Sequence, residues 1–149
     1  MIAIVVALIA VAVAIGAWFR PAPKPEAPAA KTYSDQEIAD AKKAVCDAYQ
    51  RVDRALTATT SKGGGGQSTE DVLISMNVRL ALTEGAQYLM TRLNEEPATP
   101  DPLAEAVRKA TDAYQNIAIA RLGDAPQSEV DEIIKNGDPS ISAIKDECR

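Results

Sequence analysis

The sequence opens with an uninterrupted apolar run, residues 2–19, which reads IAIVVALIAVAVAIGAWF and contains no charged residue. A helix of this length spans about 27 Å at a rise of 1.5 Å per residue, close to the thickness of a hydrocarbon core of about 30 Å. Trp18 and Phe19 suit the membrane interface, and Arg20 ends the run. We therefore predict that residues 2–19 form a transmembrane anchor.

A cleavable signal peptide is the alternative interpretation of this run. No Lys or Arg precedes it, and it is longer than the roughly 7–15 residues of a usual signal core. The nearest candidate cleavage site is Ala14-Ile15-Gly16-Ala17, in which Ile15 occupies a position that needs a small residue. A second candidate, Ala27-Pro28-Ala29, lies too far downstream. These features favour an uncleaved anchor.

Residues 20–32 form a second segment of distinct composition, rich in proline and alanine. Proline fixes φ and lacks a backbone N–H, so the segment is predicted to be an extended, semi-rigid linker. Such a segment can also be a ligand for SH3-like domains, but the alanines between its prolines favour a spacer. The remaining chain, residues 33–149, is then one domain outside the bilayer.

This domain begins with the sequence of a capping box, with Ser34 as the N-cap and Glu37 at the third helical position. The apolar residues that follow are spaced alternately by three and four, as on one helix face: Ile38, Ala41, Val45, Ala48, Val52 and Ala55. The helix is predicted to end near Ala58, before the four glycines of 63–66. Lys62 precedes these glycines and no strand leads into them, so they are a flexible connection and not a phosphate loop.

A second helix is predicted from residue 68 or 69 to Asn94, before Pro97. A helical projection places its apolar residues on one broad arc: Leu82, Leu93, Ala86, Val72, Met90, Met76 and Leu80. Arg79 falls in the middle of this arc, where a guanidinium must be paired or must face a cleft.

Arg79 therefore has two interpretations. The structural one is an ion pair with a carboxylate such as Asp47 or Glu84, or a side chain that extends outward to solvent. The functional one is an anion-binding residue, for example for a lipid head group. We favour the structural interpretation and keep Arg79 as the candidate ion-pair or anion site.

The third helix is predicted to have Asp101 as N-cap, Pro102 as first residue and Gly123 just beyond its end. Two shorter helices are predicted at 128–135 and 139–148, separated by a stop at Asn136-Gly137 and a new cap at Asp138. Their core candidates are Ile133, Ile134, Ile141 and Ile144. With no segment that has the length and pattern of a strand, the fold class is all-α, a three- to four-helix bundle with antiparallel neighbours.

The chain has two cysteines, Cys46 at the edge of the apolar face of the first helix and Cys148 next to the last residue. A redox pair or a metal site is disfavoured because there is no CxxC motif and no histidine. We predict a structural disulfide, which implies an oxidising compartment. Arg20 and Lys24 would by the positive-inside rule keep the domain in the cytoplasm, but the disulfide argues for the opposite side, which we favour.

The composition also excludes classes of function. The absence of histidine removes His general bases, Ser-His-Asp and Cys-His nucleophiles and most zinc and haem ligation. Sixteen basic against 21 acidic residues, a net charge of -5, argue against binding to nucleic acid. The carboxylates form no metal-like or acid/base pattern. We expect no enzyme activity, no cofactor and no metal.

Three stretches carry a resemblance to a known group of proteins. They are Tyr33-Ser34-Asp35 with Ile38, Ala41-Lys42 and Cys46; Asn77 to Leu82 with Gly85, Tyr88 and Leu89; and Pro97 to Pro100 with Leu103 to Arg108. The chain resembles mycobacterial alanine- and proline-rich single-pass membrane proteins, whose biochemical function is unknown. The resemblance implies a domain on the outer, periplasmic side of the cytoplasmic membrane, and implies no activity.

We therefore expect a non-catalytic, membrane-anchored extracytoplasmic module, an accessory or scaffold subunit of a membrane or cell-envelope complex. Its partners would be membrane lipids and another membrane or envelope protein. The alternative is a small-ligand or lipid-binding module with a cavity between helices around Met76, Met90 and Arg79. A filled core with an exposed apolar patch would favour the scaffold, and an apolar cavity of a few hundred Å³ would favour the alternative.

Overall fold

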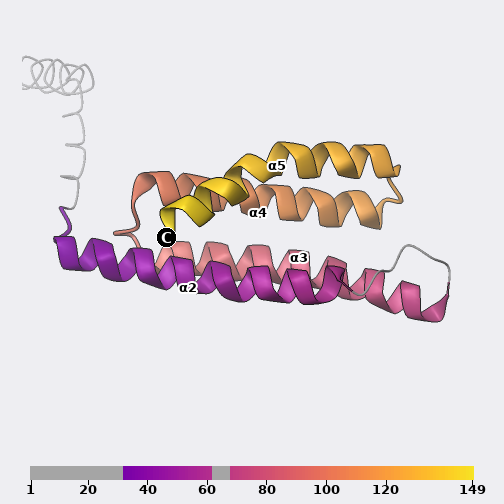
Figure 1. Ribbon diagram of the computed structural model, residues 1–149, viewed down its shortest axis with the longest axis horizontal. Coiled ribbons are helices and arrows are strands. Elements are labelled where there is room, and N and C mark those ends of the chain that lie inside the picture. The colour runs from indigo at the N-terminus through magenta and orange to yellow at the C-terminus, as the bar shows by residue number, and fades with distance from the viewer. Residues whose placement is uncertain (1–31, 62–67) are drawn as a thin grey trace, which may run out of the picture. The chain divides into compact units, whose positions relative to one another are not determined.

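The computed structural model describes residues 32–61 and 68–149, which contain four α-helices and no strand. The helices are α2 (Asp35–Thr60), α3 (Thr69–Glu95), α4 (Asp101–Leu122) and α5 (Gln127–Glu147). Each helix packs against the next one in the chain, and successive helices run in opposite directions (Figure 1). The prediction of an all-α bundle is confirmed for this part of the chain.

The predicted anchor, residues 2–19, lies outside the described residues, as do 20–31 of the linker and the four glycines of 63–66. Among the helices that the structure describes, none combines the length and the apolar character that crossing a membrane requires. Tyr33–Arg149 form one compact unit.

Capping boxes begin the first two helices of the unit. The Ser34 backbone N–H donates to the Glu37 carboxylate at 2.8 Å, and the Glu37 N–H donates to the Ser34 hydroxyl at 3.3 Å. The Ser34 backbone N–H and hydroxyl both donate to the Glu37 carboxylate, and these two bonds lower the pKa of Glu37. Ser68 and Asp71 make the same reciprocal pair at the start of α3. Both predicted starts are thus confirmed.

The boundaries of α4 differ slightly from their predicted places. Asp101 is the first helical residue, Pro100 is the N-cap, and neither side chain makes a capping bond there. Gly123 is the C-cap with φ of -88°, and the residue with positive φ is Asp124, at 51°. Pro100 at the N-cap and Pro102 in the first turn suit this helix start, because proline presets helical φ and its missing N–H needs no partner there.

The core between the helices consists mainly of valine, leucine and alanine. Its largest completely buried apolar side chains are Leu89, Leu103, Ile144, Val45, Val107 and Val130. Alanines bring the backbones close together, and Gly85 continues this pattern, because a β-carbon there would lie 2.7 Å from Val52 Cγ1. Of the predicted apolar face of α2, Ala55 is exposed, while its neighbours from Ala41 to Val52 are buried.

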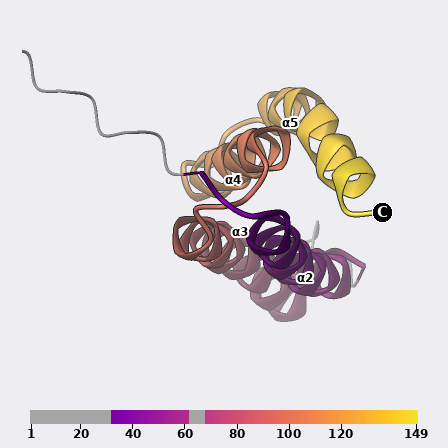
Figure 2. The ribbon, with the colours of Figure 1, turned by 90° about the vertical axis from the view of Figure 1, so that its left-hand side faces the viewer.

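The prediction of two short C-terminal helices is wrong, since α5 is one helix that contains Pro139. Gly137 does not end it, because this glycine is buried where α5 crosses α4: a β-carbon there would lie 2.8 Å from Ala113 Cβ. The Ser140 hydroxyl donates to the Gly137 carbonyl. The C-terminal half of α5 turns toward α2 (Figure 2). Ile134, a predicted core residue, is 40% exposed.

Candidate functional site

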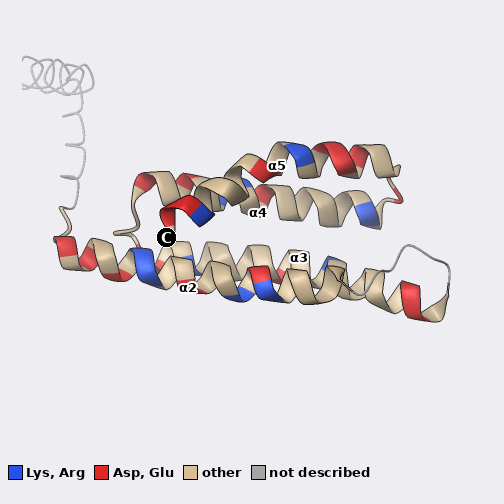
Figure 3. Ribbon diagram, viewed as in Figure 1, with Lys and Arg blue, Asp and Glu red and all other residues tan. Residues whose placement is uncertain are grey.

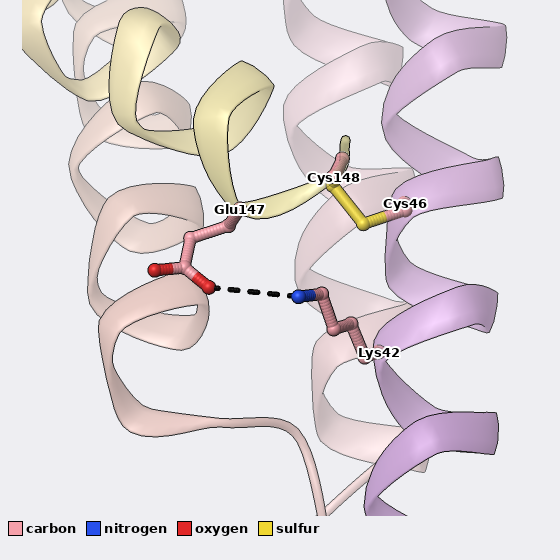
Figure 4. A network of polar contacts seen from close by, with 4 residues as sticks. All are labelled: Lys42, Cys46, Glu147 and Cys148. Carbon is pink, nitrogen blue, oxygen red and sulfur yellow. Dashed lines mark ion pairs between the residues drawn. A yellow bond between two sulfur atoms is a disulfide. The ribbon is translucent and has the colours of Figure 1, made fainter.

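The C-terminus is joined to α2 by the predicted disulfide. Cys46 and Cys148 are bonded, with their Cα atoms 5.6 Å apart and a sequence separation of 102 (Figure 4). Beside the bridge, Lys42 Nζ lies 3.8 Å from Glu147 Oε2. Because that ion pair is partly exposed, it contributes little to stability, and the covalent bond is the main connection. Both cysteines of the chain are used in this bridge.

A cluster of tyrosine and charged residues links α2, α4 and α5 further along the bundle. The Tyr49 hydroxyl donates to Asp53 Oδ1 at 3.4 Å, and Lys145 Nζ lies 3.9 Å from the same oxygen. Burial, and secondarily the charge of Asp53, raises the pKa of Tyr114 to about 12. Burial also raises the pKa of Tyr49. Both phenols are therefore protonated at neutral pH and can act there as hydrogen-bond donors.

Arg79 does not form the predicted ion pair with Asp47 or Glu84. The Asp47 carboxylate instead accepts from Lys43 at 2.6 Å, a bond that lowers its pKa. Arg79 is half-buried, and its Nε is buried without a hydrogen-bond partner among the residues that the structure describes. The guanidinium thus lies at the border between the core-facing side of α3 and its outer side.

The outer side of α3 is apolar. Val72, Leu73, Met76 and Leu80 are 49–58% exposed, although three of them were predicted to share an arc with the buried Leu82. The prediction of one arc is wrong because α3 has two apolar faces, one packed in the bundle and one open. In the sequence, no charged residue stands between Val72 and Leu80 except Arg79, and Figure 3 marks the charged positions along the ribbon. The helical projection of the sequence did not include Leu73 among the residues of the apolar arc.

Other exposed large apolar residues lie in the same half of the bundle. Ile119 and Leu122 belong to the last turns of α4 and Ile134 to the first half of α5. Figure 1 shows that α3 and α5 begin, and α4 ends, at the end of the bundle remote from the C-terminus and from the start of α2. We name the seven residues, four on α3 and these three, the distal apolar residues.

A groove of about 700 Å³ lies between α4 and α5. Small residues form its floor, among them Ala106, Ala113 and Gly137, and polar residues stand around them, such as the ion pair of Glu105 with Lys109 at 2.6 Å. Neither Arg79 nor the methionines of α3 line this groove. Its place is therefore different from that of the cavity suggested by the sequence.

The described residues hold no group of three Cys, Asp or Glu side chains that is arranged to bind a metal ion. Comparison of the chain with protein-family models, with curated proteins and with solved structures found no match. The geometry of the unit is thus the basis for a functional interpretation, and its most distinctive features are the distal apolar residues and the bridge.

Proposed function

We propose that the chain is a non-catalytic scaffold or accessory module that residues 2–19 hold in the cytoplasmic membrane, with its helical domain on the outer side. The observation that carries the proposal is the set of seven exposed distal apolar residues toward one end of the bundle. Exposed apolar surface on a folded domain is typical of interaction sites when several large side chains share it. The disulfide supports the outer compartment, because such bonds persist under oxidising conditions.

The partner in this proposal is another membrane or cell-envelope protein, with lipid around the anchor. The same compartment is the one that the resemblance of the sequence to mycobacterial alanine- and proline-rich single-pass membrane proteins would imply. Neither nucleic acid nor a metal is part of the proposal, because the net charge is -5 and histidine is absent. The distal apolar residues are already exposed in the folded bundle, so binding through them requires no unfolding.

The test is purification of the tagged full chain from native membranes in mild detergent, followed by mass spectrometry. A stoichiometric membrane partner is the expected result. The double variant Ile119→Glu/Leu122→Glu places charge in the distal surface without touching the core and should lose that partner. Gln50→Glu on the exposed side of α2 is the matched control and should keep it. A chain that purifies alone would contradict the proposal.

A second candidate function is binding of a small ligand in the α4–α5 groove, which the 700 Å³ volume favours. A small molecule that co-purifies with the parent chain and is lost from Ala143→Trp would support this second function. Ala143 lines the groove and is exposed, so the larger side chain fills the groove without entering the core.

A further inference from the structure

The open face of α3 has the spacing of a coiled-coil seam. Leu73, Met76 and Leu80 follow one another at intervals of three and four residues, the a and d positions of a heptad repeat. Thr69 and Thr83 occupy the d positions before and after them. The three apolar side chains are 56–58% exposed, so the seam, which we define as residues 69–84, is uncovered within the described chain.

The opposite side of the same turns packs in the bundle. In this register Val78 and Gly85 are at f and Leu82 is at c, the positions that point away from a coiled-coil partner. Leu82 and Gly85 are buried, and Val78 packs against the core cluster. The bundle thus uses one face of α3 and leaves the a and d face free for another helix.

Charge on the flanks of the seam selects the kind of helix that fits. Arg79 occupies a g position and Glu84 the e position five residues later, which face each other between the chains of a parallel two-stranded coiled coil. Neither residue makes an ion pair within the described residues, and Arg79 Nε has no hydrogen-bond partner there. In an antiparallel pair equivalent flanks would meet, so that Arg79 would approach a second Arg79.

We propose that the seam is an interface between two copies of this chain, related by a two-fold axis along α3. Such an axis makes both copies contribute the same leucines and forms the Arg79–Glu84 pair twice. The seam is about 24 Å long, shorter than the three to four heptads of a stable coiled coil. We therefore expect weak association in dilute solution and a populated dimer where a membrane concentrates the chains.

The proposed anchor also suits a weak interface, because it holds both copies in one bilayer and so raises their local concentration. This point rests on the proposed function, whereas the spacing and the charges do not. The inference concerns self-association, so a partner of another kind would bind elsewhere, for example at Ile119 and Leu122.

The first test is cross-linking of the full chain reconstituted in lipid bilayers. A parallel, in-register seam brings Met76 of both copies within the Cα separation of about 4.4–6.8 Å that a disulfide requires. Met76→Cys should therefore form a covalent dimer under mild oxidation, about tenfold more than the control Gln50→Cys on the exposed side of α2. Equal cross-linking of both variants would overturn the proposal.

The second test exchanges the flanking charges, with dimerisation measured by energy transfer between labelled copies in the same bilayers. Arg79→Glu and Glu84→Arg each place like charges opposite one another twice and should raise the dissociation constant about threefold or more. The double variant restores both pairs and should return it to the parent value. Single variants without effect, or a double variant without recovery, would overturn the parallel register.

Leu80→Glu removes the seam without loss of a buried group and should abolish the dimer while the circular dichroism spectrum and thermal midpoint stay near the parent values. A dimer that survives this change would also overturn the proposal. These measurements contain only this chain and lipid. Their outcome is therefore independent of whether native membranes yield a partner, and failure of one proposal does not imply failure of the other.

Discussion

Removal of the disulfide should cause a large loss of stability in this domain. The variant is Cys46→Ala/Cys148→Ala. The bridge joins residues 102 positions apart, and closing a loop of this length restricts the unfolded chain by about 4.7 kcal/mol in the chain-entropy account. Domains of this size are stable by about 5–15 kcal/mol, so the bridge supplies a large part of the total.

The loss should arise almost entirely in the unfolded state. Ile144, one turn before Cys148, is completely buried, and it keeps the end of α5 in place without the bridge. The folded variant should therefore retain the parent's helical circular dichroism. Its thermal midpoint should fall by about 15–20 °C, at roughly 4 °C for each kcal/mol in a domain of this size.

Urea denaturation followed at 222 nm measures the effect directly. Besides the lower free energy of unfolding, the variant should show a larger m-value, because its unfolded chain is free to expand and exposes more surface. The parent chain reduced with dithiothreitol is the matched control and should agree with the variant within about 1 kcal/mol. A loss below about 1 kcal/mol in both would refute the reasoning that the bridge acts on the unfolded chain.

Three further changes test other parts of the structure by urea denaturation. Gly137→Ala should lower the free energy of unfolding by about 1–2 kcal/mol, because a methyl 2.8 Å from Ala113 Cβ costs more than the roughly 0.5–1 kcal/mol gained in helix propensity; equal stability would contradict the close crossing. Arg79→Leu should be neutral or stabilising by up to about 1 kcal/mol, because it removes a buried, unpartnered Nε; a loss of several kcal/mol would reveal an ion pair. Burial raises the pKa of Tyr114 to about 12 and also raises that of Tyr49, so both stay protonated when folded while the unfolded chain ionises near pH 10. The contribution of the two tyrosines should thus be constant below about pH 9, and stability should fall above pH 10 by about 1.4 kcal/mol per pH unit for each tyrosine; an unchanged slope in Tyr114→Phe would contradict this.

Features that depend on neighbours in sequence could be predicted. The capping box at Ser34, the start of α3 at Ser68 and the helical class follow from side chains within a few residues of each other. The Cys46–Cys148 pairing was also predictable, because a chain with two cysteines has only one possible internal bridge.

Features that depend on a packing partner could not be predicted. Gly137 and Pro139 have the local signature of a helix end, yet α5 continues because Gly137 allows the close approach of Ala113. In the same way, a helical projection of α3 shows which residues are apolar but not which of them face the bundle. Leu82 and Leu80 are both leucines of one helix, and only the position of the neighbouring helices makes the first buried and the second exposed.

The place of the bridge also determines how the bundle responds to a pulling force. Tension applied between residue 32 and the C-terminus runs along α2 only as far as Cys46, crosses the sulfur–sulfur bond to Cys148 and leaves through Arg149. The rest of α2 and all of α3, α4 and α5 up to residue 147 lie inside the closed loop and bear no load. Residues 32–46 are the segment that bears the load. When fully extended, this segment is about 50 Å long, at roughly 3.5 Å per residue, and it cannot lengthen further. Under a pulling force, the greater part of the bundle is therefore protected from mechanical unfolding by the disulfide.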